Sequence, residues 1–284
     1  MKILVTGYTG QLGFDVVRYG MKQGHNMVGV GSKDVDITNE EDVSLYIKSV
    51  NPDAIIHCAA YTSVDNAEDD RDTCKSVNVK GTKYLAKVAR EINSKFLYIS
   101  TDYVFNGDGD SAFVETDEPK PIGYYGQTKY KGEEIVKQFL DNWFIVRISW
   151  VFGINGNNFV KTMLRLAETR KELNVVGDQV GSPTYTFDLA KLLINMIQTD
   201  KYGIYHASNE GFCSWAEFAK EIFRQANKEV KVNSILTEDF PTRAVRPKNS
   251  RMLKQKLADN GFSLLPTWQD AVERYLNELV QEVK

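Results

Sequence analysis

The chain has 284 residues, of which 42% are hydrophobic and 26% charged, a composition typical of globular proteins that bury a large core. Its formal net charge of −3 provides no general positive field of the kind that attracts nucleic acids, so we predict no nucleic-acid partner. Three cysteines without CxxC spacing, and no apolar run near the roughly 18 residues of a membrane span, favour a cytoplasmic protein without disulfides, a zinc site or a membrane partner.

The first half of the chain alternates short apolar runs with helical patterns. The chain starts directly in the first run, without a charged leader and cleavage site, so we expect no signal peptide. The runs are nearly continuous in apolar residues, as parallel strands covered on both faces are, and they lie at 2–7, 26–31, 53–60, 95–101 and 143–152. Between them, Thr38 and Glu41 predict a capping box, and residues 77–92 carry apolar side chains at helical spacing. This alternation predicts an α/β protein with a Rossmann-like, doubly wound parallel sheet.

Helical patterns dominate the second half of the chain. They lie at 157–171, 188–198, 215–226 and 267–283. Ser214 and Glu217 predict a capping box before the third of them. We expect a smaller, mainly helical substrate-binding domain over the carboxyl edge of the sheet, where open α/β folds bind ligands. The predicted dinucleotide-binding domain covers 1–150 and about 184–207, and the substrate-binding domain covers about 151–183 and 208–284.

The first predicted strand ends in the run GYTGQLG, in which Gly7, Gly10 and Gly13 have GxxGxxG spacing. Glycines at such positions allow a tight turn, let backbone N–H groups approach a pyrophosphate and let the helix pack on the strand. The run lies at the first strand-to-helix turn of an alternating chain, which favours dinucleotide binding over a plain glycine-rich turn.

The end of the second predicted strand bears on the choice of cofactor. A NAD site usually has an acidic residue there, which binds the ribose 2′-hydroxyl. This chain has Gly31, Ser32 and Lys33 instead, and a hydroxyl with an ammonium suits a 2′-phosphate, which favours NADPH. Asp34 is close enough to keep NADH as an alternative, and a solvated loop charge is an equal alternative for Lys33.

Tyr125 and Lys129 are four residues apart in the run YYGQTK, so they share one face of a helix. By itself this spacing favours a contact between two side chains on a solvent-facing helix. Several runs together resemble the extended short-chain dehydrogenase/reductase family, and the resemblance extends over essentially the whole chain. They are GYTGQLG, HCAAYTSVDNAE, STDYVF, YYGQTK, RISWVFG, NNFVKTMLRLA, DQVGSPT and RPKNSRM.

The resemblance is strongest to the nucleotide-sugar ketoreductases, and it implies a reaction. The 4-keto group of dTDP-4-dehydro-L-rhamnose would be reduced to dTDP-L-rhamnose with hydride from NADPH or NADH, for cell-surface polysaccharide. It places Thr101, Tyr125 and Lys129 in the active site. A neutral Tyr125 can give a proton to the developing alkoxide, Lys129 would stabilise the tyrosine anion and bind the nicotinamide ribose, and Thr101 would hold the oxygen.

The resemblance also implies contacts with both ligands. The cofactor contacts, besides the glycines, Ser32, Lys33, Tyr125 and Lys129, are Gln11, Leu12, Asp36, Ile37, Ala59, Ala60, Tyr61 and Asn78. The substrate contacts, besides Thr101, are Thr62, Val64, Asp102, Trp150, Gln179, Ser182 and Arg246. Arg246 belongs to a basic run with Arg243, Lys248 and Arg251, in which guanidinium groups suit phosphate oxygens. Trp150 could equally be a core residue, and Asn78 could bond a neighbouring turn.

The residue that follows Asp102 distinguishes a reductase from a dehydratase, and here it is Tyr103. Nucleotide-sugar dehydratases of the same superfamily have an Asp and then a Glu after the active-site Thr, whereas here Asp102 is followed by Tyr103. We therefore predict simple reduction, with Asp102 as a substrate contact or a strand-end cap. The alternatives are another nucleotide-sugar ketoreductase, or a non-catalytic regulatory subunit like the relative associated with methionine adenosyltransferase. The oligomeric state stays open, with a homodimer as one candidate. Asp15 and Glu278 lie near positions of an interface metal in some related reductases, but we predict no metal.

Overall fold

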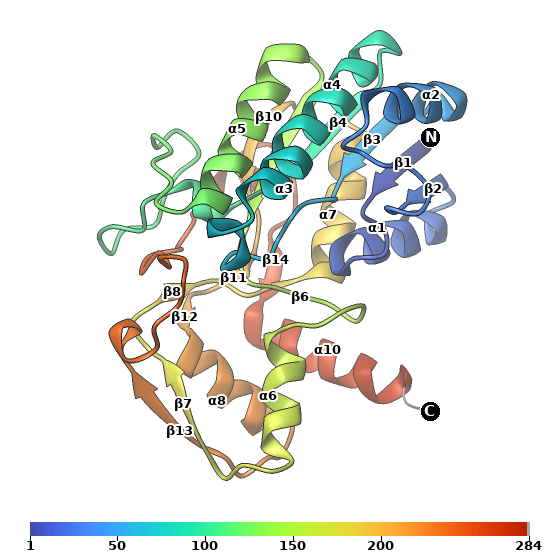
Figure 1. Cartoon of the computed structure of the whole chain (residues 1–284). Coiled ribbons are helices and arrows are strands. Elements are labelled where there is room, and N and C mark those ends of the chain that lie inside the picture. Colours follow the sequence, from blue (N-terminus) through green and yellow to red (C-terminus); the bar gives the residue numbers. More distant parts are fainter. Residues whose placement is uncertain (283–284) are drawn as a thin grey trace.

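The computed structural model describes residues 1–282 and contains a central sheet of six parallel strands (Figure 1). Across the sheet their order is β10-β5-β4-β3-β1-β2. Their bounds are β1 Lys2–Thr6, β2 Asn26–Val30, β3 Ala54–His57, β4 Lys95–Thr101, β5 Trp143–Ile148 and β10 Gly203–His206. The predicted doubly wound parallel sheet is confirmed, and β10 completes one edge of it.

Helices cover both faces of this sheet because consecutive strand residues point to opposite sides. Ile3 and Val5 of β1 belong to the core under α1 (Gln11–Lys22) and α7 (Thr186–Ile197). Leu4 belongs to the core on the other face. That face carries α2 (Glu40–Val50), α4 (Thr82–Glu91) and α5 (Tyr124–Phe139).

Two local predictions in the first half are wrong in detail. The N-cap of α2 is Asn39, whose side chain accepts hydrogen bonds from the backbone of Glu41 and Asp42, while the Thr38 hydroxyl donates to Asp36 instead. The predicted helix 77–92 is a π-helical turn (Ser76–Gly81) followed by α4, and the helical stretch begins earlier than predicted, with α3 (Arg71–Lys75). The π turn contains Asn78, and such turns are frequent at functional sites.

The later part of the chain builds a second core below the sheet (Figure 1). Its helices are α6 (Phe159–Ala167), α8 (Trp215–Gln225) and α10 (Trp268–Glu282). The capping box of Ser214 and Glu217 at the start of α8 is confirmed. The predicted division into two domains stays a prediction, which the presence of this separate core supports.

Short strand pairs accompany these helices, and the sequence pattern does not predict them because most contain only two or three residues. They are β7 (Glu172–Val176) with β13 (Lys231–Ile235), β6 (Val151–Phe152) with β9 (Thr184–Tyr185), β8 (Val180–Gly181) with β12 (Cys213–Ser214), and β11 (Asn209–Glu210) with β14 (Leu265–Thr267). The remaining helix is α9 (Gln255–Asp259). Within residues 1–282, no helix has the length and apolarity required to cross a bilayer.

Candidate active site

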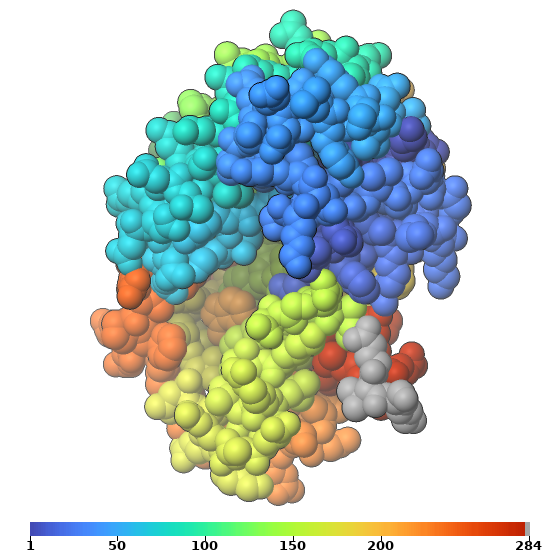
Figure 2. Space-filling model, turned by 45° about the vertical axis from the view of Figure 1, so that its right-hand side comes forward, coloured from blue at the N-terminus to red at the C-terminus, as the bar shows by residue number. Residues whose placement is uncertain are grey.

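A cavity of about 600 Å³ opens at the carboxyl ends of the parallel strands. Figure 2 shows a hollow between the blue-to-cyan residues of the first half and the yellow-green segment that contains α6. The predicted site residues that line the cavity are Gly7, Gly10, Gln11, Leu12, Gly13, Ser32, Asp36, Ile37, Ala59, Ala60, Thr62, Val64, Thr101, Asp102, Tyr125, Lys129 and Trp150. Most of the predicted site is therefore brought together at one edge of the sheet.

The glycine loop connects β1 to α1, and each of its three glycines has a different structural role. Gly7 has φ +69°, and a Cβ there would lie 2.8 Å from the backbone of Ala59. A Cβ on Gly13 would lie 2.3 Å from the carbonyl oxygen of Gly7, so only glycine lets α1 pack this closely. Gly10 is the N-cap of α1 without a side-chain cap, and its Cβ would meet only the Gly7 oxygen, at 3.3 Å. The loop thus leaves the helix N-terminus open toward the cavity, as an anion cradle requires.

Tyr125 and Lys129 are buried in the cavity wall, so the alternative of a solvent-facing pair is wrong. Tyr125 is 9% exposed and Lys129 is 3% exposed. Thr101 is the last residue of β4 and lines the same cavity. The Tyr125 ring packs edge-on against Tyr103, with ring centroids 5.6 Å apart, and Lys129 Nζ lies 4.1 Å from the centroid of the Tyr98 ring.

Burial controls the protonation of this pair. It raises the pKa of the Tyr125 hydroxyl above its ordinary value; Asp102 adds to the rise, and a hydrogen bond with Thr101 opposes it. Burial lowers the pKa of Lys129 to about 7. The effect of burial dominates over any stabilisation of the tyrosine anion by Lys129, so Tyr125 is held as a neutral proton donor.

Asp102 lies next to Thr101 and is only 3% exposed. Its Oδ1 accepts a hydrogen bond of 2.9 Å from the Thr101 hydroxyl, and the Ser250 side chain also stabilises the carboxylate, although no donor among the described residues meets hydrogen-bond geometry at the buried Oδ2. Burial raises the pKa of this carboxyl to about 6. A buried acceptor of this kind, in a cavity wall, can accept a hydrogen bond from a ligand hydroxyl.

Trp150 packs against another aromatic side chain and also lines the cavity, and its contact with the substrate stays a prediction. Its φ of +49° is unusual for a bulky residue, and residues in such conformations cluster at ligand sites. The indole stacks on Trp215 of α8 with ring centroids 3.7 Å apart, and it also lines the cavity.

Three predicted cofactor residues lie outside the cavity lining. Lys33 is exposed on the loop after β2. The Asn78 side chain accepts a hydrogen bond of 2.8 Å from the backbone N–H of Tyr61 and donates one of 3.0 Å to the hydroxyl of Thr128. Asn78 and Tyr61 therefore join the loop after β3 to α5, the helix that carries Tyr125 and Lys129.

Three predicted substrate residues are also outside the lining. The Gln179 amide donates to Thr237, and the Ser182 hydroxyl donates to the carbonyl of Gly211. Arg246 pairs with Asp65, at 2.5 Å, and donates a hydrogen bond of 3.0 Å to the hydroxyl of Tyr103. The other members of the basic run also have acidic partners, and the pairs are Arg243 with Asp69, Lys248 with Asp178 and Arg251 with Asp110.

Some lining residues were not predicted as contacts. Cys58, Tyr103 and Ser149 line the cavity, and each follows the end of a parallel strand, β3, β4 or β5. Position after a strand was the signal that could have found them, because ligands bind at the carboxyl ends of parallel strands.

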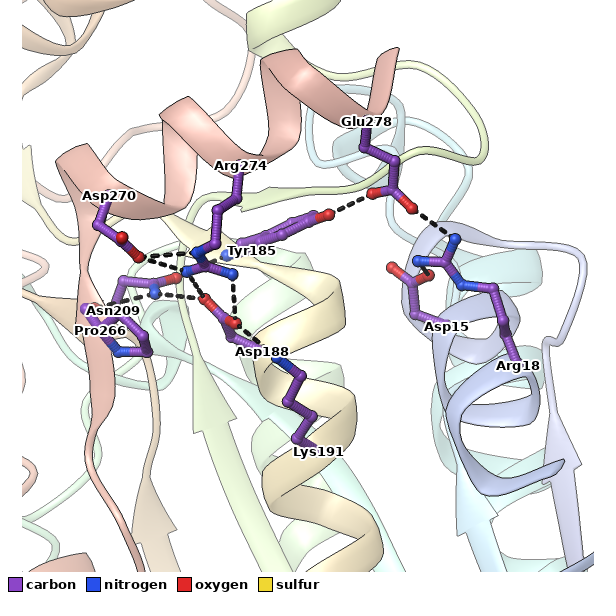
Figure 3. Close-up of polar contacts among 10 residues, drawn as sticks. All are labelled: Asp15, Arg18, Tyr185, Asp188, Lys191, Asn209, Pro266, Asp270, Arg274 and Glu278. Carbon is purple, nitrogen blue, oxygen red and sulfur yellow. Dashed lines mark hydrogen bonds and ion pairs between the residues drawn. The ribbon is translucent and has the colours of Figure 1, made fainter. Parts of the chain in front are cut away.

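Asp15 and Glu278 lie near each other, with Arg18 between them (Figure 3). The Arg18 guanidinium is 2.8 Å from Asp15 and 2.5 Å from Glu278, and the Tyr185 hydroxyl donates to Glu278. These contacts join α10 to α1 and β9. No group of three or more His, Cys, Asp or Glu residues suited to a metal occurs within residues 1–282, and the absence of a metal stays a prediction.

Comparison with known proteins identifies the family. The sequence model of the family described as RmlD substrate binding domain matches residues 1–281. The chain belongs to the RmlD substrate binding domain family. The RmlD match covers nearly the whole chain, and it agrees with the resemblance that the motifs indicate.

Individual relatives also match the chain over nearly its whole length. The chain is 42% identical to a dTDP-4-dehydrorhamnose reductase of Aggregatibacter actinomycetemcomitans, over 96% of this chain and 97% of that protein. It is 39% identical to the spore coat polysaccharide biosynthesis protein SpsK of Bacillus subtilis (strain 168), over 98% of this chain and 97% of that protein. The crystal structure of dTDP-4-dehydrorhamnose reductase from Bacillus anthracis in complex with NADP matches with a TM-score of 0.95 and 44% identity, covering 98% of this chain and 99% of that one.

Proposed function

We propose that this protein is an oxidoreductase that reduces the 4-keto group of dTDP-4-dehydro-L-rhamnose to dTDP-L-rhamnose, with NADPH as the hydride donor. The observation that carries the proposal is the burial of Tyr125 and Lys129 in one cavity with the glycine loop. Relatives that bear the name dTDP-4-dehydrorhamnose reductase support it. The relative named for spore coat polysaccharide biosynthesis supports a place in polysaccharide precursor synthesis.

The cavity fits a nicotinamide dinucleotide at the glycine loop. Gly10 leaves room where a larger side chain would occupy the cradle, and the N-terminus of α1 offers N–H groups and positive potential to a pyrophosphate. Ser32 lines the cavity after β2, and the Asp34 carboxylate already accepts a hydrogen bond from the backbone of Gly31. Both features support NADPH over NADH.

The reduction needs a hydride and a proton. When bound, NADPH supplies the hydride to the carbonyl carbon of the sugar. Tyr125, held neutral by burial, gives its hydroxyl proton to the carbonyl oxygen as negative charge develops there. The Thr101 hydroxyl, which turns its proton from Asp102 to the ligand, holds that oxygen, and the Lys129 ammonium stabilises the tyrosine anion left behind.

The substrate lies in the part of the cavity away from the glycine loop. Thr62, Val64 and Trp150 contact the sugar, and the Asp102 carboxylate accepts a hydrogen bond from one of its hydroxyls. Arg246 remains a candidate for the diphosphate, because its contact with Tyr103 brings the guanidinium to the rim of the cavity.

Isotope transfer tests the proposal. Purified protein is incubated with dTDP-4-dehydro-L-rhamnose and NADPH deuterated at the transferred position, and the product is examined by proton NMR. The expected product is dTDP-L-rhamnose with deuterium at C4. Deuterium at C4 of the epimeric alcohol would replace the proposed product by that of another ketoreductase, and unchanged substrate beside bound NADPH would contradict reduction of this sugar.

A further inference from the structure

A buried carboxylate lies one helical turn beyond Lys129. Tyr125, Lys129 and Glu133 follow one another at intervals of four residues, so they share one face of α5. The side chain of Glu133 is 0% exposed. A carboxylate this deep is costly to bury unless other groups compensate its charge.

Two neighbouring strands hold this carboxylate. Arg147 of β5 donates two hydrogen bonds to it, from Nε to Oε1 at 2.9 Å and from Nη2 to Oε2 at 2.8 Å. The Ser100 hydroxyl of β4 donates a third, at 2.6 Å to Oε1. Ser100 and Arg147 are paired across the sheet, and Ser100 immediately precedes Thr101. One side chain therefore fixes α5 to both strands at the level of the active site.

Tyr98 brings the same helix close to β4. Its hydroxyl donates a hydrogen bond of 3.3 Å to the carbonyl of Lys129, and its ring lies under the Lys129 ammonium. A Cβ on Gly132 would lie 2.2 Å from the Tyr98 hydroxyl, so a glycine is required at this contact. The helix and the strand are in close contact from Lys129 to Glu133.

Few groups around Lys129 carry charge. The ionisable and aromatic side chains that face it from the surrounding elements are His57, Cys58, Cys74, Tyr98, Tyr125 and Glu133. Burial lowers the pKa of His57 to about 3 and raises the pKa of Cys58 to about 12, so both are neutral at pH 7. Burial likewise raises the pKa of the Cys74 thiol and those of both tyrosines. Among these described groups, Glu133 alone brings a negative charge.

We propose that Glu133 is a positioning residue of the active site. Its carboxylate, fixed by Arg147 and Ser100, keeps Lys129 charged and holds the catalytic helix against the strand that ends at Thr101. The inference rests on the proposed function, because it assumes that Lys129 must be charged for Tyr125 to lose its proton.

The sign of the effect follows from the charges. Burial lowers the pKa of Lys129, and Glu133 opposes that lowering. Glu133→Gln removes the opposing charge and leaves Arg147 unpaired, so Lys129 loses its proton at lower pH. Glu133→Gln/Arg147→Gln removes the unpaired cation as well, so part of the change in the Lys129 titration is reversed. A merely structural ion pair would change the melting temperature in both variants without moving the titration of Lys129.

The first readout is the titration of Lys129 itself. Protein labelled with ¹³C at the lysine ε carbon is titrated by NMR, and the resonance that disappears in Lys129→Gln is assigned to Lys129. We expect its midpoint to fall by about one pH unit in Glu133→Gln and by less in the double variant. Ser100→Ala, which removes one hydrogen bond and no charge, should change the midpoint least. Equal midpoints in wild type, Glu133→Gln and the double variant would overturn the proposal.

The second readout is turnover as a function of pH. The alkaline limb of kcat should move to lower pH in Glu133→Gln, and turnover above that limb should fall about tenfold for each pH unit that the limb moves, while KM for the sugar nucleotide changes little. Glu134→Gln is the matched control, because Glu134 adjoins Glu133 on α5 but pairs with Lys131 at the surface. A limb that stays in place would overturn the proposal. If the wild-type protein reduces no sugar nucleotide, the proposed function fails, and the NMR titration still decides the role of Glu133.

If Glu133→Gln does not fold, the double variant decides the proposal, because it leaves no buried charge without its partner. A Lys129 midpoint in the double variant below those of wild type and Ser100→Ala supports the proposal. A midpoint at the wild-type value in the double variant overturns it.

Discussion

Two regions beside the cavity, the wall with Tyr125 and the rim with Arg246, are held together by different forces. The wall with Tyr125, Lys129 and Thr101 rests on buried contacts, above all the Glu133 carboxylate between Arg147 and Ser100. The rim segment, residues 237–251, reaches the cavity through the contact of Arg246 with Tyr103, and its ion pairs have side chains that are partly or largely exposed. Pairs of this second kind contribute little each to the free energy of folding. The difference predicts that changes in the first wall act on turnover and changes in the rim act on substrate binding.

The largest effect is expected for Tyr125→Phe. Loss of a general acid lowers turnover by about 10²- to 10⁴-fold, while the buried ring is retained and NADPH binding should be unchanged. Tyr124→Phe is the control, since Tyr124 is next on the same helix but does not line the cavity. Steady-state kinetics and fluorescence titration of NADPH measure both quantities. Full activity in Tyr125→Phe would remove this residue as the proton donor.

Two substitutions in the glycine loop should separate an effect on packing from an effect on cofactor binding. Gly13→Ala places a Cβ 2.3 Å from a backbone oxygen and should lower the free energy of unfolding by about 1–3 kcal/mol. Gly10→Ala meets only one atom, at 3.3 Å, so it should leave the melting temperature nearly unchanged and raise the Kd for NADPH by about tenfold. Thermal unfolding and cofactor titration test the pair. Equal Kd values for Gly10→Ala and wild type would place the pyrophosphate elsewhere.

Protonation of Asp102 should lower kcat/KM at acidic pH. Burial raises the pKa of this carboxyl to about 6, so it gains a proton as pH falls through 6 and then no longer accepts a hydrogen bond from the sugar as a carboxylate. We expect kcat/KM to fall about tenfold per pH unit below that point in wild type. In Asp102→Asn the limb should be absent and the plateau lower. A limb that persists in Asp102→Asn would assign it to another group.

The smallest effect is expected at the rim. Arg246→Gln breaks the contacts with Asp65 and Tyr103 and should raise KM for the sugar nucleotide about 2- to 5-fold with little change in kcat. Arg243→Gln is the matched control, because its pair with Asp69 is 66% exposed at both ends and should contribute nothing measurable. A large loss of kcat in Arg246→Gln would mean that the rim belongs to the rigid catalytic wall.

The same contrast explains what could be predicted from sequence. The glycine loop and the strands follow from local spacing and periodicity, whereas the pair Tyr125 and Lys129 follows from the resemblance to the extended short-chain dehydrogenase/reductase family. The structure brings all of them together in one cavity. The partners of Arg246 could not be predicted, because Asp65 is 181 residues away in the chain. The hydrogen bonds of Asn78 could not be predicted either, because they depend on the π turn and on the loop at Tyr61. Loop conformations follow from such long-range pairing, which no local pattern contains.

The most direct test of the central claim is absorbance at 340 nm with NADPH and dTDP-4-dehydro-L-rhamnose, for wild type and Tyr125→Phe side by side. The account predicts substrate-dependent loss of absorbance with wild type and almost none with the variant, although both bind NADPH. No loss with wild type, or equal loss with both proteins, would contradict it.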